Sequence, residues 1–349
     1  MKVLLVKVSA LGDVVHALPV LAWLKSADSA MEIDWLVESR FALLLEGHPL
    51  LRRIVCLDTK GWRKQGAGQA FRGFLEVIRQ LRRARYDLVL DLQGNSKSGL
   101  FTLLSGAPVR YGFARDSVRE WPNLLSTNRK VVPAESDFHI TDRYLAVSKA
   151  AFPSGREIRT AGPLPVNAGA AAAVTARLAE AGLTAGPLVI LHYGTTWVTK
   201  LWPLSHWQEL VGRLISEKGL RPVLTWGSES ELAAVRAIQE ANDSRCLIWP
   251  RGNFKELIAL LARADLVVGG DTGPVHIAAA VGTSTVSIFR VTDANRNAPR
   301  GEGHMSLSAR MECSPCQRKS CDLDQECGQS VTVAAVNAAI EKLFGEILS

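Results

Sequence analysis

The chain has 349 residues, of which 47% are hydrophobic and 21% are charged. This length exceeds one ordinary hydrophobic core and predicts two domains. No apolar run approaches the roughly 18 residues of a membrane-spanning helix. The first residues also lack the apolar region and small-residue cleavage site of a signal peptide. We therefore expect a cytoplasmic protein.

The positive charge is concentrated in the first half of the chain. Residues 1–160 hold 24 Lys and Arg against 16 Asp and Glu, a net of +8, whereas the remainder holds 17 against 18, a net of −1. This asymmetry favours an acidic partner for the first half, namely a phosphorylated lipid, an acidic sugar or a nucleic acid. The alternative is that the excess positive charge forms an ordinary solvent-exposed surface without a specific partner.

Short apolar runs typical of strands alternate with helical patterns along the first half. We expect strands at 2–8, 32–37, 53–57, 88–92 and 109–112, and helices at 14–25, 41–46, 71–85, 98–104 and 137–151. Between them, residues 58–70 are polar and contain glycine, which predicts a long loop. Residues 152–169 contain Pro153, Pro163 and Pro165 and are the candidate linker.

The alternation resumes after the linker. We expect strands at 188–192, 222–226, 246–249, 266–270 and 285–289, and helices at 170–181, 205–217, 230–242, 254–263, 277–282 and 331–348. The pattern predicts an α/β protein with two doubly wound parallel sheets, one in residues 1–160 and one in residues 161–330. We expect residues 331–349 to form a helix that packs back on the N-terminal domain. Ligands in such sheets bind beyond the carboxyl ends of the strands, and two such sets of ends are expected to face each other across a cleft.

The segment from Asp271 to His276 lies between an apolar strand pattern and a helical pattern. Thr272 is suited to cap the helix and Pro274 to occupy its first turn. Gly273 allows a ligand to approach the backbone, and the free N–H groups of a helix N-terminus favour an anion such as a diphosphate. An ordinary capped helix is the alternative.

Three further loops follow predicted strands. Asp13 opens a helix, either as a capping residue or as a carboxylate that takes a proton from an acceptor hydroxyl. Thr195, Thr196 and Lys200 suit a phosphate site, because they combine hydroxyl donors with a point charge. Glu231 is suited to accept hydrogen bonds from ribose hydroxyls, and equally suited to stabilise the first turn of a helix.

Several competing signatures are absent from the sequence. There is no G-x-G-x-x-G after the first strand, no G-x-x-x-x-G-K-[ST] and no G-x-S-x-G. Their absence disfavours a dinucleotide dehydrogenase, a P-loop enzyme and a hydrolase with a nucleophile elbow.

The motifs that remain resemble those of the bacterial lipopolysaccharide heptosyltransferases, in order and along nearly the whole chain. The matching segments are Lys2–His16 with its Gly-Asp pair, Ile33–Glu38, Phe41-Ala42, Tyr111-Gly112-Phe113, Asn128-Arg129-Lys130, Thr195–Trp207 and the D-T-G-x-x-H of Asp271–His276. The segments of the first half look most like heptosyltransferase I. The resemblance implies two Rossmann-like domains of the glycosyltransferase B (GT-B) type.

The resemblance also implies an activity and its substrates. The C-terminal domain would bind ADP-heptose as the donor, with no cofactor required. The N-terminal domain would bind a lipid-linked acidic acceptor of the Kdo₂-lipid A kind, at the cytoplasmic face of the inner membrane. The enzyme would be inverting and metal-independent, peripheral to that membrane, and without a nucleic-acid partner.

The resemblance assigns roles residue by residue. Asp13 matches the catalytic base. The implied donor contacts are Thr195, Thr196 and Lys200 at the diphosphate, Glu231 at the ribose, and Asp271, Thr272, Gly273 and His276 near the heptose and diphosphate. The implied acceptor contacts are the basic residues Arg63, Lys64, Lys97 and Arg119, in the half that carries the excess positive charge.

One segment departs from heptosyltransferase I. Cys313, Cys316, Cys321 and Cys327 form a C-x₂-C-x₄-C-x₅-C pattern that looks more like the tail segment of heptosyltransferase II. The alternative is therefore a heptosyltransferase II or another heptosyltransferase, whose acceptor already carries heptose. The four cysteines either hold zinc, at an irregular spacing for a structural site, or are structural residues. A cytosolic setting disfavours a disulfide framework.

Two alternatives from other classes follow from the same sequence. A sugar-nucleotide epimerase of the same fold would act on the donor without an acceptor. A nucleic-acid-binding protein would use the basic half and a cysteine-held metal, and its binding would depend steeply on salt.

Overall fold

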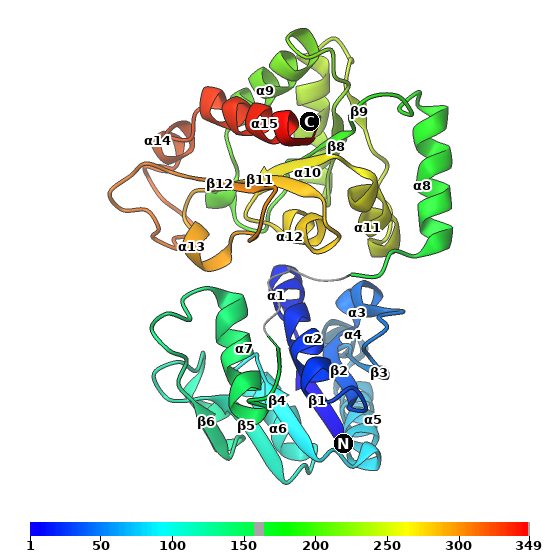
Figure 1. Cartoon of the computed structure of the whole chain (residues 1–349), viewed down its shortest axis with the longest axis vertical. Coiled ribbons are helices and arrows are strands. Elements are labelled where there is room, and N and C mark those ends of the chain that lie inside the picture. Colours follow the sequence, from blue (N-terminus) through cyan, green and yellow to red (C-terminus); the bar gives the residue numbers. More distant parts are fainter. Residues whose placement is uncertain (157–163, 348–349) are drawn as a thin grey trace. The chain divides into compact units, whose positions relative to one another are not determined.

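The computed structural model describes residues 1–156 and 164–347. The chain divides into two compact units, Met1–Arg159 and Thr160–Ser349, each built around a parallel sheet (Figure 1). The expected linker at 152–169 lies partly outside the described residues. Within the described ranges, no helix combines the length and the hydropathy needed to cross a membrane.

The sheet of the first unit has six strands in the order β3-β2-β1-β4-β5-β6, and all of its strand pairs are parallel. The strands are β1 (Lys2–Val6), β2 (Glu32–Glu38), β3 (Arg53–Leu57), β4 (Leu88–Asp91), β5 (Val109–Phe113) and β6 (Arg129–Val131). The helical segments are α1 (Leu11–His16), α2 (Leu18–Ala27), α3 (Ser39–Leu45), α4 (Thr59–Gln65), α5 (Ala67–Ala84), α6 (Ser96–Leu104), the 3₁₀ helix η1 (Trp121–Leu125) and α7 (Ile140–Ala151).

The sheet of the second unit repeats this plan in the order β12-β11-β10-β7-β8-β9, again all parallel. The strands are β7 (Val189–His192), β8 (Val223–Thr225), β9 (Leu247–Ile248), β10 (Leu266–Gly270), β11 (Ser284–Phe289) and β12 (His304–Ser308). The helical segments are α8 (Ala168–Glu180), η2 (Val198–Lys200), α9 (Leu204–Ser216), α10 (Glu229–Glu240), α11 (Phe254–Arg263), α12 (Gly273–Ala280), α13 (Ala294–Asn297), α14 (Asp324–Gln329) and α15 (Val333–Ile347). Two doubly wound α/β sheets confirm the predicted fold class.

Burial on both faces explains why the central strands appear in the sequence as continuous apolar runs. Leu4 and Val6 of β1 pack in a cluster with side chains of α5 and α6. Val3 and Leu5, which alternate with them along the strand, are equally buried. A parallel strand covered by helices on both faces loses the alternation of polar and apolar residues.

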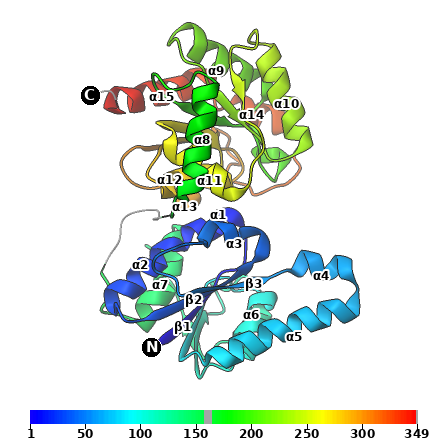
Figure 2. The same cartoon turned by 90° about the vertical axis from the view of Figure 1, so that its right-hand side faces the viewer.

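The segment expected as a loop at 58–70 is mostly helical. Asp58 caps α4 by accepting a hydrogen bond from the N–H of Gly61 at 2.9 Å, and Gly66, at φ +85°, separates α4 from α5. Figure 2 shows α4 and the beginning of α5 extending away from the sheet of the first unit. Gly61 and Gly66 suggested a loop, whereas in the structure they serve a helix cap and a break between two helices.

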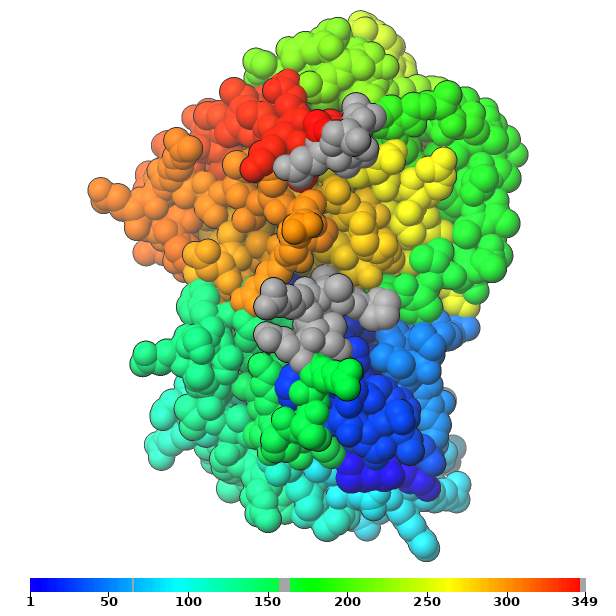
Figure 3. All heavy atoms as spheres, viewed as in Figure 1, coloured from blue at the N-terminus to red at the C-terminus, as the bar shows by residue number. Residues whose placement is uncertain are grey.

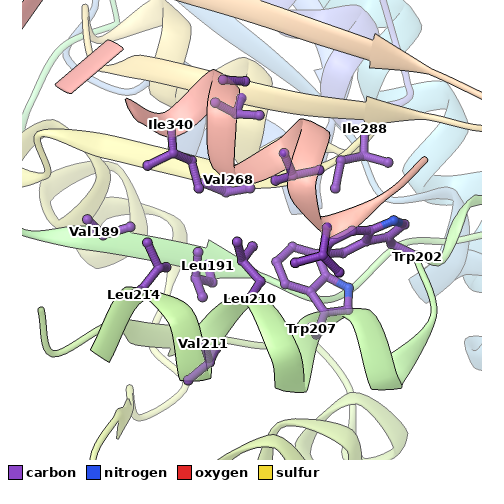
Figure 4. Close-up of a cluster of buried hydrophobic side chains, with 14 of the residues drawn as sticks. Val189, Leu191, Trp202, Trp207, Leu210, Val211, Leu214, Val268, Ile288 and Ile340 are labelled. Atoms are coloured by element: carbon purple, nitrogen blue, oxygen red, sulfur yellow. The ribbon is translucent and has the colours of Figure 1, made fainter. Parts of the chain in front are cut away.

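The expectation for the C-terminal helix is wrong. α15 packs within the second unit, where Ile340 and Leu343 join the cluster formed by Trp207 and Leu210 of α9 (Figure 4). The indole of Trp202 donates at 2.8 Å to the carbonyl oxygen of Val331, two residues before this helix. Figure 3 shows the atoms of α15, in red, at the surface of the second unit. The apolar stripe of the helix predicted that it packs on a core, but not on which one.

Candidate active site

The strand order places the candidate residues at the switch point of each sheet. In the first sheet the order reverses between β1 and β4, and in the second between β7 and β10. The loops that leave neighbouring strands in opposite directions open a crevice at this point, where ligands of doubly wound sheets bind. Asp13 follows β1, Lys200 follows β7 and Asp271 follows β10.

Asp13 lies in the first turn of α1 and is held by three groups. Its Oδ1 accepts a hydrogen bond from the Tyr144 hydroxyl at 2.8 Å and lies 3.6 Å from the Lys7 ammonium. Its Oδ2 accepts from the N–H of Ala10 at 3.0 Å. The Asp13 side chain is 31% exposed, whereas Lys7 is almost fully buried. The carboxylate is thus fixed in orientation and still open to a ligand.

The surroundings of Asp13 favour its charged form. Burial by itself raises the pKa of this carboxyl, but the Lys7 charge, the N–H of Ala10 and the Tyr144 hydroxyl together bring it below its usual value. Burial lowers the pKa of Lys7, and the Asp13 charge opposes that effect. Asp13 is therefore ionised at neutral pH, as a group that accepts a proton must be.

The predicted acceptor residues occupy two regions of the first unit. Lys97, in the first turn of α6, forms an ion pair of 2.8 Å with Glu38 at the end of β2. Arg119 lies near enough to Lys7 for its charge to help lower the pKa of that ammonium. Arg63 and Lys64 are exposed on α4. The structure thus brings Lys97 and Arg119 to the carboxyl edge of the sheet and leaves Arg63 and Lys64 on the projecting helix.

Lys200 and Asp271 form the centre of the candidate site in the second unit. The Lys200 ammonium lies 2.6 Å from Oδ2 of Asp271, which also accepts from the Thr292 hydroxyl at 2.7 Å. Oδ1 of Asp271 lies 3.2 Å from Nε2 of His276. An ammonium has three N–H donors, so Lys200 keeps capacity for a phosphate oxygen while it is paired with Asp271.

The Asp271 carboxylate is 8% exposed and is held by protein groups. Burial raises its pKa, but the hydrogen bond with His276 and the Lys200 charge outweigh that effect and lower the pKa well below its usual value. A buried ionised carboxylate with these partners fixes the positions of Lys200 and His276. The geometry supports a role for Asp271 in ordering this loop.

The N-terminus of α12 adjoins this pair. Thr272 occupies the N-cap position, in extended conformation, and its side chain makes no capping hydrogen bond to the helix. Gly273 and Pro274 form the first turn, so the predicted helix start is in place, while the predicted side-chain cap is not. The Thr272 hydroxyl and the first N–H groups of the helix are suited to an anion.

Glu231 and the two threonines lie on neighbouring loops. Oε2 of Glu231 accepts from the N–H of Gly227 at 2.6 Å. The same carboxylate also lies against the loop after β7. Its Oε2 would be 2.0 Å from a Cβ added to Gly194 in that loop. A side chain at position 194 would therefore require the Glu231 carboxylate to move. Thr195 and Thr196 follow directly, and Thr196 is exposed.

Some residues around the site were not among the predicted ones. Lys7 ends an apolar run just before the Asp13 loop, which is a signal in the sequence. Tyr144 lies 131 positions from Asp13 and Thr292 lies 21 from Asp271, and neither has a recognisable signal in the sequence.

Two lysines lie over the ring of Trp197. The ammonium of Lys319, from the cysteine segment, is 5.1 Å from the centre of the ring, and that of Lys200 is 4.9 Å from it.

The cysteine segment contacts the candidate donor loop. The carbonyl oxygen of Arg318 accepts from the Thr199 hydroxyl at 2.7 Å, and Ser314 donates to the carbonyl oxygen of Arg290 at 2.5 Å. All six cysteines are free thiols. Among the residues that the structure describes, no group of three or more His, Cys, Asp or Glu side chains is arranged to hold a metal ion, so the zinc alternative has no support there.

Comparison with known proteins identifies the family. The model of glycosyltransferase family 9 (heptosyltransferase) matches residues 74–326. Lipopolysaccharide heptosyltransferase 1 of Pseudomonas aeruginosa is 34% identical, over 92% of this chain and 87% of that protein, and its Escherichia coli K12 counterpart is 28% identical, over 89% and 95%. The solved structure of E. coli heptosyltransferase WaaC with ADP superposes with a TM-score of 0.80 and 27% identity, over 98% of this chain and 100% of that one. The chain belongs to glycosyltransferase family 9, the heptosyltransferase family.

Proposed function

We propose that this glycosyltransferase transfers heptose from ADP-L-glycero-D-manno-heptose to the Kdo region of the lipopolysaccharide inner core. The acceptor would be Kdo₂-lipid A or a similar lipid-linked acidic sugar, met at the cytoplasmic face of the inner membrane. The observation that carries the proposal is the pairing of Lys200 with Asp271 beside the N-terminus of α12, at the switch point of the second sheet. Relatives named lipopolysaccharide heptosyltransferase 1 support heptose as the transferred sugar and lipopolysaccharide as the acceptor class, and the solved structure of a similar heptosyltransferase with ADP supports the donor.

The chemical step assigned to Asp13 is proton transfer from the acceptor. As a Kdo hydroxyl oxygen attacks the anomeric carbon of heptose, its proton passes to the Asp13 carboxylate. The bond between that carbon and the diphosphate oxygen breaks on the opposite face, which inverts the configuration. The transition state has oxocarbenium character, as in glycoside chemistry generally. A carboxylate of low pKa suffices because the attacking hydroxyl becomes more acidic as the new bond forms.

The leaving diphosphate gains negative charge as the bond breaks. Lys200, the hydroxyls of Thr195 and Thr196, and the N-terminus of α12 at Thr272 and Gly273 would stabilise that charge without a metal. Glu231 would accept hydrogen bonds from the ribose, and Asp271 and His276 would hold Lys200 and contact the heptose. The donor and the acceptor must meet for transfer. The protein would therefore close around both substrates, which would also exclude water from the reaction.

The proposed acceptor would carry phosphates and carboxylates, and the net charge of +8 on residues 1–160 suits such a partner. Arg63 and Lys64 on α4 and Lys97 and Arg119 at the carboxyl edge would pair with these groups. Lys97 would exchange part of its pairing with Glu38 for the acceptor.

The test of the proposal is transfer from ADP-heptose to defined acceptors. We expect product with Kdo₂-lipid A and little with its monoheptosylated form, measured by mass spectrometry of the lipid. A preference for the monoheptosylated acceptor would instead assign heptosyltransferase II activity. Conversion of the donor sugar without any acceptor would assign an epimerase.

Replacing Lys7 by methionine tests how Asp13 is held ionised. The Lys7 charge lowers the pKa of Asp13, so its removal raises that pKa, and the base becomes protonated at a higher pH. We expect the acidic limb of the kcat–pH profile to move up by about one to three pH units. The measurement is kcat for heptosyl transfer from about pH 3 to 8, a range that starts below the usual carboxyl pKa of about 4.

The Tyr144→Phe variant is the matched control for Lys7→Met. It removes one neutral hydrogen bond to the same carboxylate oxygen and should move the limb less than the loss of Lys7. A Lys7→Met enzyme that loses activity equally at every pH would show a structural role only and would contradict the electrostatic one.

A further inference from the structure

Four large apolar side chains are exposed along α6 and η1 of the first unit. The exposed fractions are 45% for Leu100, 44% for Leu103, 70% for Trp121 and 74% for Leu125. We call these four residues the α6–η1 strip. Single exposed apolar residues are ordinary, but a group on adjoining segments marks an interaction surface.

The segments that bear the strip run alongside each other. At one end, the Ser96 hydroxyl and N–H both donate to the Glu120 carboxylate, at 2.6 and 2.9 Å. Further along, a Cβ added to Gly99 would lie 3.2 Å from the Cα of Asn123 in η1, so the backbones approach closely there. Leu100 and Leu103 are three residues apart and share one face of α6. The four side chains therefore border one continuous surface.

Basic residues flank the strip on both sides. On one side, α5 lies next to α6 (Figure 2), and Nε of Arg82 donates to the carbonyl oxygen of Leu104, the last residue of α6, at 3.0 Å. On the other side, Arg110 and Lys130 donate to carbonyl oxygens just after η1, at 2.7 and 2.6 Å. Arg72, Arg79 and Arg83 are exposed on α5.

The strip begins at the substrate edge of the sheet. α6 follows the carboxyl end of β4, and the N–H of Glu120, the residue before Trp121, donates to the carbonyl oxygen of Gly94 in the loop after β4 at 3.0 Å. A surface bound to the strip would thus adjoin the loops of the first unit that include Asp13. Phe71, next to Arg72 on α5, and Val132, two residues after Lys130, are also exposed, whereas Leu43 lies on α3.

We propose that the α6–η1 strip is the surface through which the first unit binds an anionic phospholipid membrane. Tryptophan prefers the headgroup level of a bilayer, leucines enter the acyl boundary, and Arg and Lys pair with anionic headgroups. The proposal deepens the proposed function, since a lipid-linked acceptor would then meet Asp13 at the membrane surface. A second copy of the chain fits this surface poorly, because a two-fold contact would bring the two basic rims together.

Vesicle co-sedimentation of the full chain tests the proposal. We expect binding to vesicles of phosphatidylethanolamine with phosphatidylglycerol, weak binding to phosphatidylcholine vesicles, and release by high salt. The quadruple variant Leu100→Gln, Leu103→Gln, Trp121→Gln, Leu125→Gln should bind at least about tenfold less. Leu43→Gln, which replaces an exposed leucine elsewhere in the unit, is the matched control and should bind normally. Unchanged thermal unfolding of the variants would show that the fold is kept.

The outcomes separate this proposal from the proposed function. The vesicle experiment measures binding alone, so its result does not depend on whether the chain transfers heptose. If the chain transfers heptose, the quadruple variant should lose transfer activity on an acceptor held in vesicles. It should keep that activity on a deacylated, soluble acceptor. Equal binding of the variant and the unchanged protein to anionic vesicles would overturn the proposal, as would no binding by either. A concentration-dependent dimer in sedimentation velocity that the variant abolishes would assign the strip to self-association instead.

Discussion

Replacing Asp13 by asparagine is expected to lower kcat for heptosyl transfer by about 10²- to 10⁴-fold. Asparagine keeps an oxygen that can accept hydrogen bonds from Ala10 and Tyr144, so the loop should keep its shape while the proton acceptor is lost. Steady-state transfer with saturating ADP-heptose and acceptor measures kcat. Calorimetry should find the affinity for ADP nearly unchanged, because Asp13 belongs to the first unit and the proposed donor residues to the second.

The control for Asp13→Asn is Asp28→Asn, an exposed carboxylate at the end of α2 in the same unit. This variant should transfer heptose normally. If Asp13→Asn did the same with donor binding intact, Asp13 would not be the base, and its contacts with Lys7 and Tyr144 would be structural.

Replacing Lys200 by alanine is expected to weaken ADP binding by about 10- to 100-fold, the usual effect of losing a charged hydrogen bond. The loss in kcat should be larger, about 10²- to 10³-fold, because charge on the diphosphate grows as the glycosidic bond breaks. Calorimetry with ADP and single-turnover transfer separate the two effects. Lys218→Ala, which removes a lysine paired with Glu341 in the same unit, is the control. An unchanged affinity for ADP would refute a diphosphate role for Lys200.

The Asp271→Asn variant determines which of two roles this residue has. If Asp271 orders Lys200, the variant weakens binding of ADP itself, since ADP meets a mispositioned ammonium. If Asp271 contacts only the heptose, ADP binds normally and only the KM for ADP-heptose rises. The short contacts of its carboxylate with Lys200 and Thr292 lead us to expect the first result.

The predictions from sequence were most accurate for the long central elements. The apolar runs of β1, β4, β7 and β10 are strands at nearly the predicted positions because burial on both faces leaves a strong signal. The short edge strands β6 and β12 were not predicted. An edge strand of three to five residues has little apolar pattern in its sequence. It forms because it pairs with the neighbouring strand of the sheet.

The motifs predicted which loops form the candidate site, but not how its side chains are held. Asp13, Lys200 and Asp271 each follow a strand, and the rule that ligands bind at the carboxyl ends of strands predicted their importance. The orientation of Asp13 depends on Tyr144, which α7 brings from a distant part of the sequence. Such a contact leaves no local pattern, because only the packing of α7 against the first sheet creates it.

The sequence by itself determined the two α/β units, the loops that bear the candidate residues and the family. These follow from local patterns of hydrophobicity and from motifs, each confined to a few residues. The tertiary structure decided the rest: α15 packs on α9 in the second unit, Asp271 binds Lys200 rather than facing a ligand unpaired, and an exposed apolar strip lies between basic residues. These features join residues far apart in the chain, and their free energy depends on burial and charge pairing that exist only once the sheets have assembled.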